Sequence, residues 1–115
     1  MRVKTLAKGN PELLRGTVEL LLLKALSAGP QHGFGVARWL EEVTNDVLKI
    51  EEGSLYPALH RMESRGWLEA EWGISDKNRQ VKYYRVTRRG RDRLRAESAG
   101  WAQFAAAVSK VLQTA

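Results

Sequence analysis

Segment 53–62 carries side chains that could bind a polyanion. Ser54, Tyr56, His60 and Arg61 offer hydroxyl, imidazole and guanidinium groups, which can reach phosphates or base edges. Apolar residues fall between them at the i, i+4 and i+7 positions of a helix, namely Leu55, Leu59 and Met62. The spacing predicts a short helix with one face sealed into a core and a polar face open to a partner.

A second group of polar and basic side chains lies in a predicted turn. The run 68–74 alternates in polarity, which predicts a strand with Leu68, Ala70, Trp72 and Ile74 on one face and Glu69 and Glu71 on the other. The run 81–87 is rich in β-forming residues, so the two runs predict a hairpin. Its tip, within 75–80, would present Lys77, Asn78 and Arg79.

The positive charge is concentrated from this turn onward. The formal net charge is +6. Much of the excess positive charge comes from one run of basic residues in which Asp76 and Asp92 are the only acids. Its members are Lys77, Arg79, Lys82, Arg85, Arg88, Arg89, Arg91, Arg93 and Arg95. Such a run can be a solvated helix face, but its place beside the predicted hairpin favours a nucleic-acid surface.

Catalytic and metal chemistry have little support in the sequence. The chain has no cysteine, which removes disulfides and thiolate zinc ligands. His32 and His60 lie in different predicted elements without clustered carboxylates, and no nucleophile triad or phosphate-binding glycine loop is visible. We therefore expect no catalytic residue, metal or cofactor, and we assign His32 to a local hydrogen bond.

Two helices are predicted in the first half of the chain. The first covers 11–28, with Asn10 as its cap and Pro11 at its first position, and Gly29 and Pro30 end it. The second covers 33–43. Its predicted buried side is Phe34, Ala37, Leu40 and Val43, with Val36 and Trp39 on a flank.

A third helix covers about 52–65. Pro57 suits only a first turn, so Ser54 is predicted as the cap, with Glu52 and Gly53 as a looser lead-in. Gly66 follows as a left-handed C′ residue.

The last helix is predicted from Thr87, its cap, to about Leu112. It carries a sustained apolar stripe of Leu94, Trp101, Phe104, Ala105, Val108, Val111 and Leu112. We expect the small core to be closed already by Leu68, Trp72, Tyr84 and Val86, so the stripe needs a second chain. A two-fold dimer would hold two copies of the 52–65 helix about 34 to 36 Å apart, one turn of duplex DNA.

The order of helix, helix, helix, hairpin, helix is that of a winged helix-turn-helix. The predicted fold class is mainly α (α+β), with a two-stranded wing and an added C-terminal dimerisation helix. We expect one compact domain, in which residues 1–87 form an N-terminal arm and the DNA-binding region and residues 88–115 form the dimerisation helix. No apolar run is long enough for a membrane span and no secretory signal is visible, so we expect a cytoplasmic protein.

The chain resembles the PadR family of bacterial transcriptional regulators, in its small subfamily, from about Leu14 to Leu112. The resemblance rests on Gly16 with the leucines after it and on segments 29–34, 53–63, 65–68 and 83–90, in this order and spacing. Phe34 departs from the tyrosine that the family often has there. The resemblance implies a homodimeric DNA-binding transcription factor, usually a repressor, on an inverted-repeat operator.

The resemblance also assigns roles to residues. In the 52–65 helix it places Ser54, Tyr56, Pro57 and Arg61 at or near the major groove, and it places Lys77, Asn78 and Arg79 at a wing tip near the backbone or minor groove. Tyr56 could instead pack under the wing, and Arg61 could contact a base, a phosphate or a nearby glutamate. The dimerisation residues would be Leu94, Trp101, Phe104, Ala105, Val108 and Leu112.

Trp101 has two interpretations. Some small PadR-like proteins, which this chain resembles here, use a tryptophan on this helix to stack on flat aromatic effectors. The favoured interpretation is an ordinary dimer core, because aromatic residues dominate such interfaces. A different function also stays open: a winged-helix module that binds protein and has only non-specific nucleic-acid affinity. Sequence-specific duplex binding separates that module from a regulator.

Overall fold

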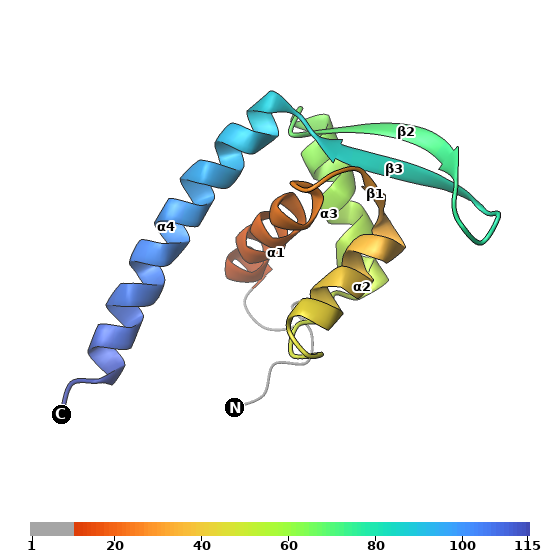
Figure 1. Ribbon diagram of the computed structural model, residues 1–115. Helices are drawn as coiled ribbons and strands as arrows, with labels where there is room; N and C mark the ends of the chain where they lie inside the picture. The colour runs from red at the N-terminus through yellow and green to blue at the C-terminus, as the bar shows by residue number, and fades with distance from the viewer. Residues whose placement is uncertain (1–10) are drawn as a thin grey trace.

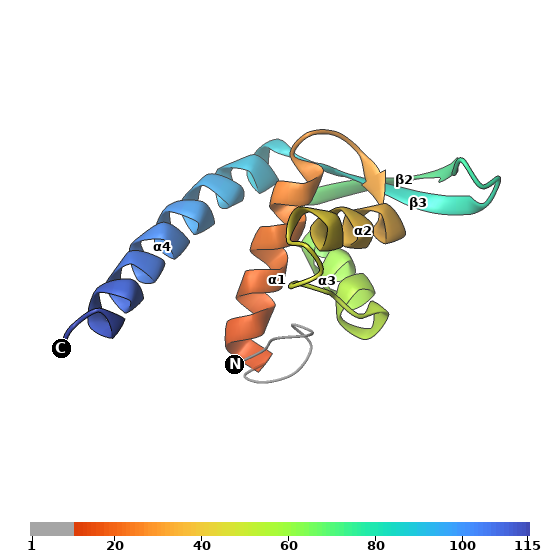
Figure 2. The same cartoon turned by 60° about the horizontal axis from the view of Figure 1, so that its bottom comes forward.

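The computed structural model describes the backbone of residues 11–115 and the side chains from Gly16 onward. The predicted cap at Asn10 and the N-terminal arm lie outside the described residues. Along the chain the elements are α1 (Pro11–Leu26), β1 (Gln31–His32), α2 (Gly33–Val43), α3 (Glu52–Ser64), β2 (Leu68–Ile74), β3 (Gln80–Val86) and α4 (Arg88–Leu112). The predicted fold class is confirmed, with helices gathered on one side of a small sheet and α4 extending away from them (Figures 1 and 2).

The sheet has the strand order β1-β3-β2 and is antiparallel throughout. The predicted hairpin is confirmed, with Leu68 opposite Val86 at its base and Ile74 opposite Gln80 near its tip. The third strand, β1, was not predicted, because two residues are too short to show an alternating pattern. It pairs Gln31 with Tyr84, so β3 becomes the central strand and β2 an edge.

The hydrophobic core lies between α1 and the elements around it. α1 packs against α2, α3 and α4, and its Leu22, Leu23 and Leu26 side chains are almost fully buried. The buried apolar residues are Val18, Leu22, Leu23, Leu26, Val36, Leu40, Ile50, Leu55, Ala58, Leu59, Met62, Trp67, Leu68, Tyr84 and Val86. Within the described chain, no helix combines the length and apolar character that crossing a bilayer requires.

The predicted buried side of α2 is wrong at two positions. Phe34 and Val43 are exposed, whereas Val36, assigned to a flank, is buried with Leu40. The buried stripe of α2 is Gly33, Val36 and Leu40. At Gly33, a Cβ atom would come within 2.7 Å of the Tyr56 ring. The close approach of α2 to α3 therefore favours a glycine at position 33, and Val36 and Leu40 follow it on the side of α2 that faces the core.

The predicted span of α3 is confirmed, but its predicted cap is wrong, and Glu52 and Gly53 are helical rather than a looser lead-in. The helix begins at Glu52 with Glu51 as its N-cap, and Ser54 is not a cap, since its backbone amide donates to the Glu51 carbonyl at 2.9 Å. Pro57 consequently lies inside the helix and removes the amide that would donate to Gly53. Because Gly53 and Pro57 are exposed, water can satisfy the freed carbonyl.

A hydrogen-bonded joint connects the end of α3 to the start of α4. Gly66 adopts the predicted left-handed conformation, with φ of 79°. The Thr87 hydroxyl donates to the Gly66 carbonyl at 2.6 Å and accepts from the Gly90 amide at 3.0 Å, which confirms Thr87 as the α4 cap. The buried Trp67 ring packs against the guanidinium groups of Arg65 and Arg93, 5.2 and 4.7 Å from its centroid.

Candidate nucleic-acid interface

The exposed face of α3 carries polar side chains that can form hydrogen bonds with phosphates or base edges. Leu55, Leu59 and Met62 are buried as predicted, and Ala58 completes that side. The opposite side leaves Tyr56, Pro57 and His60 exposed, with Ser54 half-buried beside them. The predicted polar face is therefore open to solvent.

Tyr56 lies against α2 and remains partly open. Its ring packs on the backbone of Gly33, and 42% of its surface is exposed. Burial, with a smaller contribution from Glu52, raises the pKa of Tyr56 above its ordinary value. Like any tyrosine hydroxyl, the phenol can donate a hydrogen bond, for which a phosphate oxygen is a suitable acceptor.

Arg61 contacts a glutamate in the folded chain, which is one of its three predicted alternatives. The Glu19 carboxylate of α1 accepts from Arg61 Nε and from Arg65 Nη1, each at 3.5 Å. Glu19 is 7% exposed, so the guanidinium groups of Arg61 in α3 and of Arg65 just after it meet one buried carboxylate. The sequence prediction missed Glu19, although a single acid within the apolar run of α1 could have signalled a buried ion pair.

The wing tip is a defined turn rather than a loose loop. Asn78 has φ of 59°, a conformation that asparagine tolerates, and its amide donates to the Ser75 carbonyl at 2.9 Å. The Arg79 carbonyl accepts from the Ser75 amide at 2.8 Å. Lys77 and Arg79 are exposed and have no ion-pair partner among the described residues.

The prediction that the positive charge lies in one place is wrong, because the basic residues of the wing tip and those of α4 lie apart in the structure. β3 separates the wing tip from the start of α4, which lies at the far end of the sheet (Figure 1). Several of the cations are also paired, as in Lys82 with Glu63, Arg85 with Glu69, Arg93 with Glu97 and Arg95 with Asp92. Near the outer half of the wing, Lys77 and Arg79 are the cations that no acidic side chain of the described residues pairs with.

The prediction that Trp72 closes the core is also wrong. Leu68, Tyr84 and Val86 are buried, but Trp72 is 63% exposed and Ile74 is 62% exposed on the same strand face. The helices cover only the base of the hairpin, so the outer half of its apolar face projects beyond them (Figure 1).

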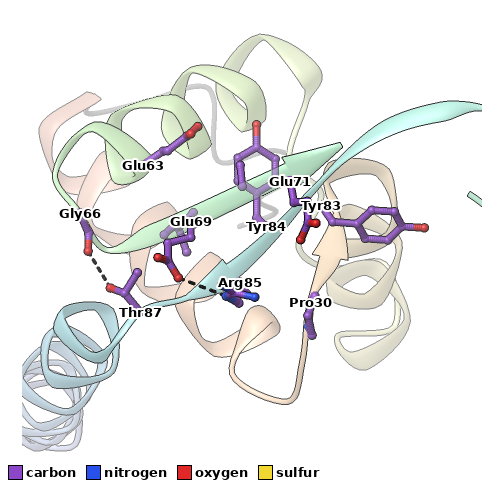
Figure 3. A pocket seen from close by; sticks show the side chains of 11 residues that line it. Pro30, Glu63, Gly66, Glu69, Glu71, Tyr83, Tyr84, Arg85 and Thr87 are labelled. Atoms are coloured by element: carbon purple, nitrogen blue, oxygen red, sulfur yellow. Dashed lines mark hydrogen bonds and ion pairs between the residues drawn. The ribbon is translucent and has the colours of Figure 1, made fainter. Parts of the chain in front are cut away.

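An open hollow of about 610 Å³ lies where β2 and β3 pass the end of α3 (Figure 3). Three carboxylates line it, those of Glu63, Glu69 and Glu71, and the Arg85 guanidinium there is already paired with Glu69 at 3.1 Å. This charge repels phosphate, so the hollow is not part of the candidate interface, which we assign to the α3 face and the wing tip.

The apolar stripe on α4 is exposed in the single chain. Trp101, Phe104, Val108, Val111 and Leu112 are open to solvent, and the Trp101 and Phe104 rings lie 6.0 Å apart. Ala105 is partly covered. Leu94 differs from the others because it packs against the core of its own chain.

Comparison with known proteins gives a consistent family assignment. The model of the transcriptional regulator PadR-like family matches residues 22–96. The transcriptional regulator Rv3488 of Mycobacterium tuberculosis is 35% identical over 81 residues, which are 70% of this chain and 71% of that protein. A PadR family transcriptional regulator from Eggerthella lenta has a TM-score of 0.75 and 36% identity, covering 90% of this chain and 88% of that one. A PadR-like transcriptional regulator from Bacillus cereus has a TM-score of 0.76 and 26% identity, covering 90% and 99%.

Proposed function

Because the chain belongs to the PadR-like family of transcriptional regulators, which are not enzymes, we propose that it is a cytoplasmic repressor. It binds a palindromic DNA operator as a homodimer. The observation that supports this proposal best is that one molecule presents both an open polar face on α3 and a basic wing tip. Lys77 and Arg79 at that tip have no acidic partner among the described residues.

In the proposed complex, α3 enters the major groove through Ser54, Tyr56 and Pro57. Arg61 reaches a phosphate from the same helix while Arg65 keeps Glu19 paired. At the wing tip, Lys77, Asn78 and Arg79 contact the backbone or the adjacent minor groove. Most of these contacts go to phosphate, so they position the protein more than they select a sequence.

The homodimer forms through the apolar stripe of α4, with Trp101, Phe104, Ala105, Val108 and Leu112 at its centre. Leu94 contributes at the edge, where the stripe meets the core of each chain. Burying these side chains supplies the association energy, and two-fold symmetry repeats the DNA-binding face in the second half-site.

Selection from a pool of random duplexes, followed by footprinting, tests this function. We expect one enriched palindrome, protected in two symmetric half-sites about one helical turn apart. Transcription from a promoter that overlaps this site should fall when the protein is added. Weak binding that depends only on duplex length and disappears with modest salt would instead support a protein-interaction module.

The effector part of the proposal concerns Trp101. Two copies of this ring at the dimer interface would stack on a flat aromatic compound and favour one spacing of the half-sites. A screen of planar aromatic compounds should yield one that quenches tryptophan emission and weakens operator binding in the wild type but not in Trp101→Ala. If every compound acts equally on both proteins, Trp101 is only a dimer-core residue.

A further inference from the structure

The outer half of the wing carries an apolar surface that the described part of the chain leaves exposed. We define the inner wing face as Trp72, Ile74, Gln80 and Lys82, which share one side of the hairpin by register. It continues the side on which Leu68, Tyr84 and Val86 are buried. Exposing a tryptophan and an isoleucine together is costly in water, so this surface fits a partner that covers it.

The charges around the inner wing face favour a polyanion as that partner. Lys82 lies directly across the hairpin from Trp72, and Lys77 and Arg79, which have no acidic partner among residues 16–115, follow at the tip. The strand carboxylates, Glu69 and Glu71, point to the opposite side because side chains alternate along β2. At the base of the inner wing face, the Glu63 carboxylate of α3 is paired with the Lys82 ammonium group at 3.1 Å.

We propose that the inner wing face packs on the deoxyribose wall of the DNA groove next to the one that α3 enters. This inference rests on the proposed function and adds Trp72 and Ile74 to its DNA contacts. Deoxyribose presents C–H groups between the phosphates, so an apolar ring can lie on sugar while cations at the wing tip reach the phosphates. Trp72 then contributes affinity without neutralising any charge.

Salt dependence separates this contact from an electrostatic one. Using the palindromic duplex selected by the wild type, we expect Trp72→Ala to weaken binding about ten-fold, as expected for loss of one buried aromatic contact. The slope of log affinity against log salt should not change, because no counterion is involved. Trp72→Phe should restore most of the affinity, and Ile74→Ala should show a smaller loss with the same slope. Trp39→Ala, which removes an exposed tryptophan from α2, is the matched control and should bind as the wild type does.

Several results would overturn the proposal. Unchanged affinity in both Trp72→Ala and Ile74→Ala would show that DNA does not cover this face. A lower salt slope in Trp72→Ala would show that the variant acts by displacing a cation. If Trp72→Ala sediments as a monomer where the wild type is a dimer, the inner wing face contacts a second copy of the chain and not DNA. If the wild type selects no palindrome, the proposed function fails first and this contact fails with it.

Discussion

At the scale of single residues, Glu19 is a buried acid that connects α1 to the C-terminal end of α3. Its carboxylate is buried and accepts from two guanidinium groups at 3.5 Å. Glu19→Ala leaves these two cations facing each other without a counter-charge. We expect the free energy of unfolding in urea to fall by about 1–3 kcal/mol, because the partly exposed arginines can recover some hydration.

The matched control for Glu19 is the ion pair on the surface of α2. Arg38 and Glu42 lie 3.7 Å apart and both are largely exposed. Glu42→Ala should cost less than about 0.5 kcal/mol at the same protein concentration. Equal losses from the two glutamate variants would show that the buried position of Glu19 does not matter.

Arg79 provides a residue-scale prediction for DNA binding. Its exposed guanidinium has no acidic partner in the described chain, so it can neutralise a phosphate. Arg79→Ala should therefore lower the salt slope of operator binding by roughly one. Arg85→Ala is the control, since Arg85 is paired with Glu69 and should leave the slope nearly unchanged. Equal slopes for wild type and Arg79→Ala would remove Arg79 from the interface.

At the scale of elements, the sequence predicts the order of helices and the hairpin well, because these depend on local patterns. Gly66 and Thr87 ended and began helices as expected, since a left-handed glycine and a capping hydroxyl act within a few residues. β1 was not predicted, because two residues are too few to show the alternating polarity of a strand. It exists because β3 has a free side that Gln31 and His32 can pair with.

The orientation of each element was harder to predict than its presence. In α2, two adjacent stripes were both apolar, and the choice between them depends on contacts with distant elements, such as that of Gly33 with Tyr56 of α3. In β2, alternation correctly placed Trp72 on the apolar side but did not show where the helices stop covering that side. Of the candidate site, the α3 face and the wing tip were therefore predicted, whereas the Glu19 anchor and the inner wing face were not.

The joint between α3 and α4 gives a prediction for these elements. A Cβ on Gly90 would lie 2.2 Å from the Trp67 carbonyl oxygen and 2.7 Å from Val86 Cγ1. Gly90→Ala must push α4 away from the sheet, and we expect it to lower the free energy of unfolding by about 2–3 kcal/mol. Gly100→Ala in the same helix meets nothing within 4 Å and should raise stability by about 0.5–1 kcal/mol. A neutral Gly90→Ala would show that the joint is not tightly packed.

At the scale of the whole molecule, the same joint gives α4 two roles. Through Thr87 and Trp67 it is fixed to the end of α3, and from there it extends away from the core with its apolar stripe exposed (Figure 2). Any partner that binds the stripe is therefore held at a defined position relative to α3. If that partner is a second copy, the distance between the two DNA-binding faces is determined by how the stripes pack.

Phe104→Glu tests this dependence in the complete protein. A charge in the middle of the stripe should raise the dimer dissociation constant by about 30-fold or more, as for the loss of a central interface residue, measured by sedimentation. Gln103→Glu adds the same charge on the other side of α4, where the stripe does not run, and should leave the dimer intact. Because each chain retains its α3 and wing, the dissociated variant should still bind a single half-site weakly but lose its preference for the palindrome. A Phe104→Glu protein that stays dimeric would show that the two copies meet through a different surface.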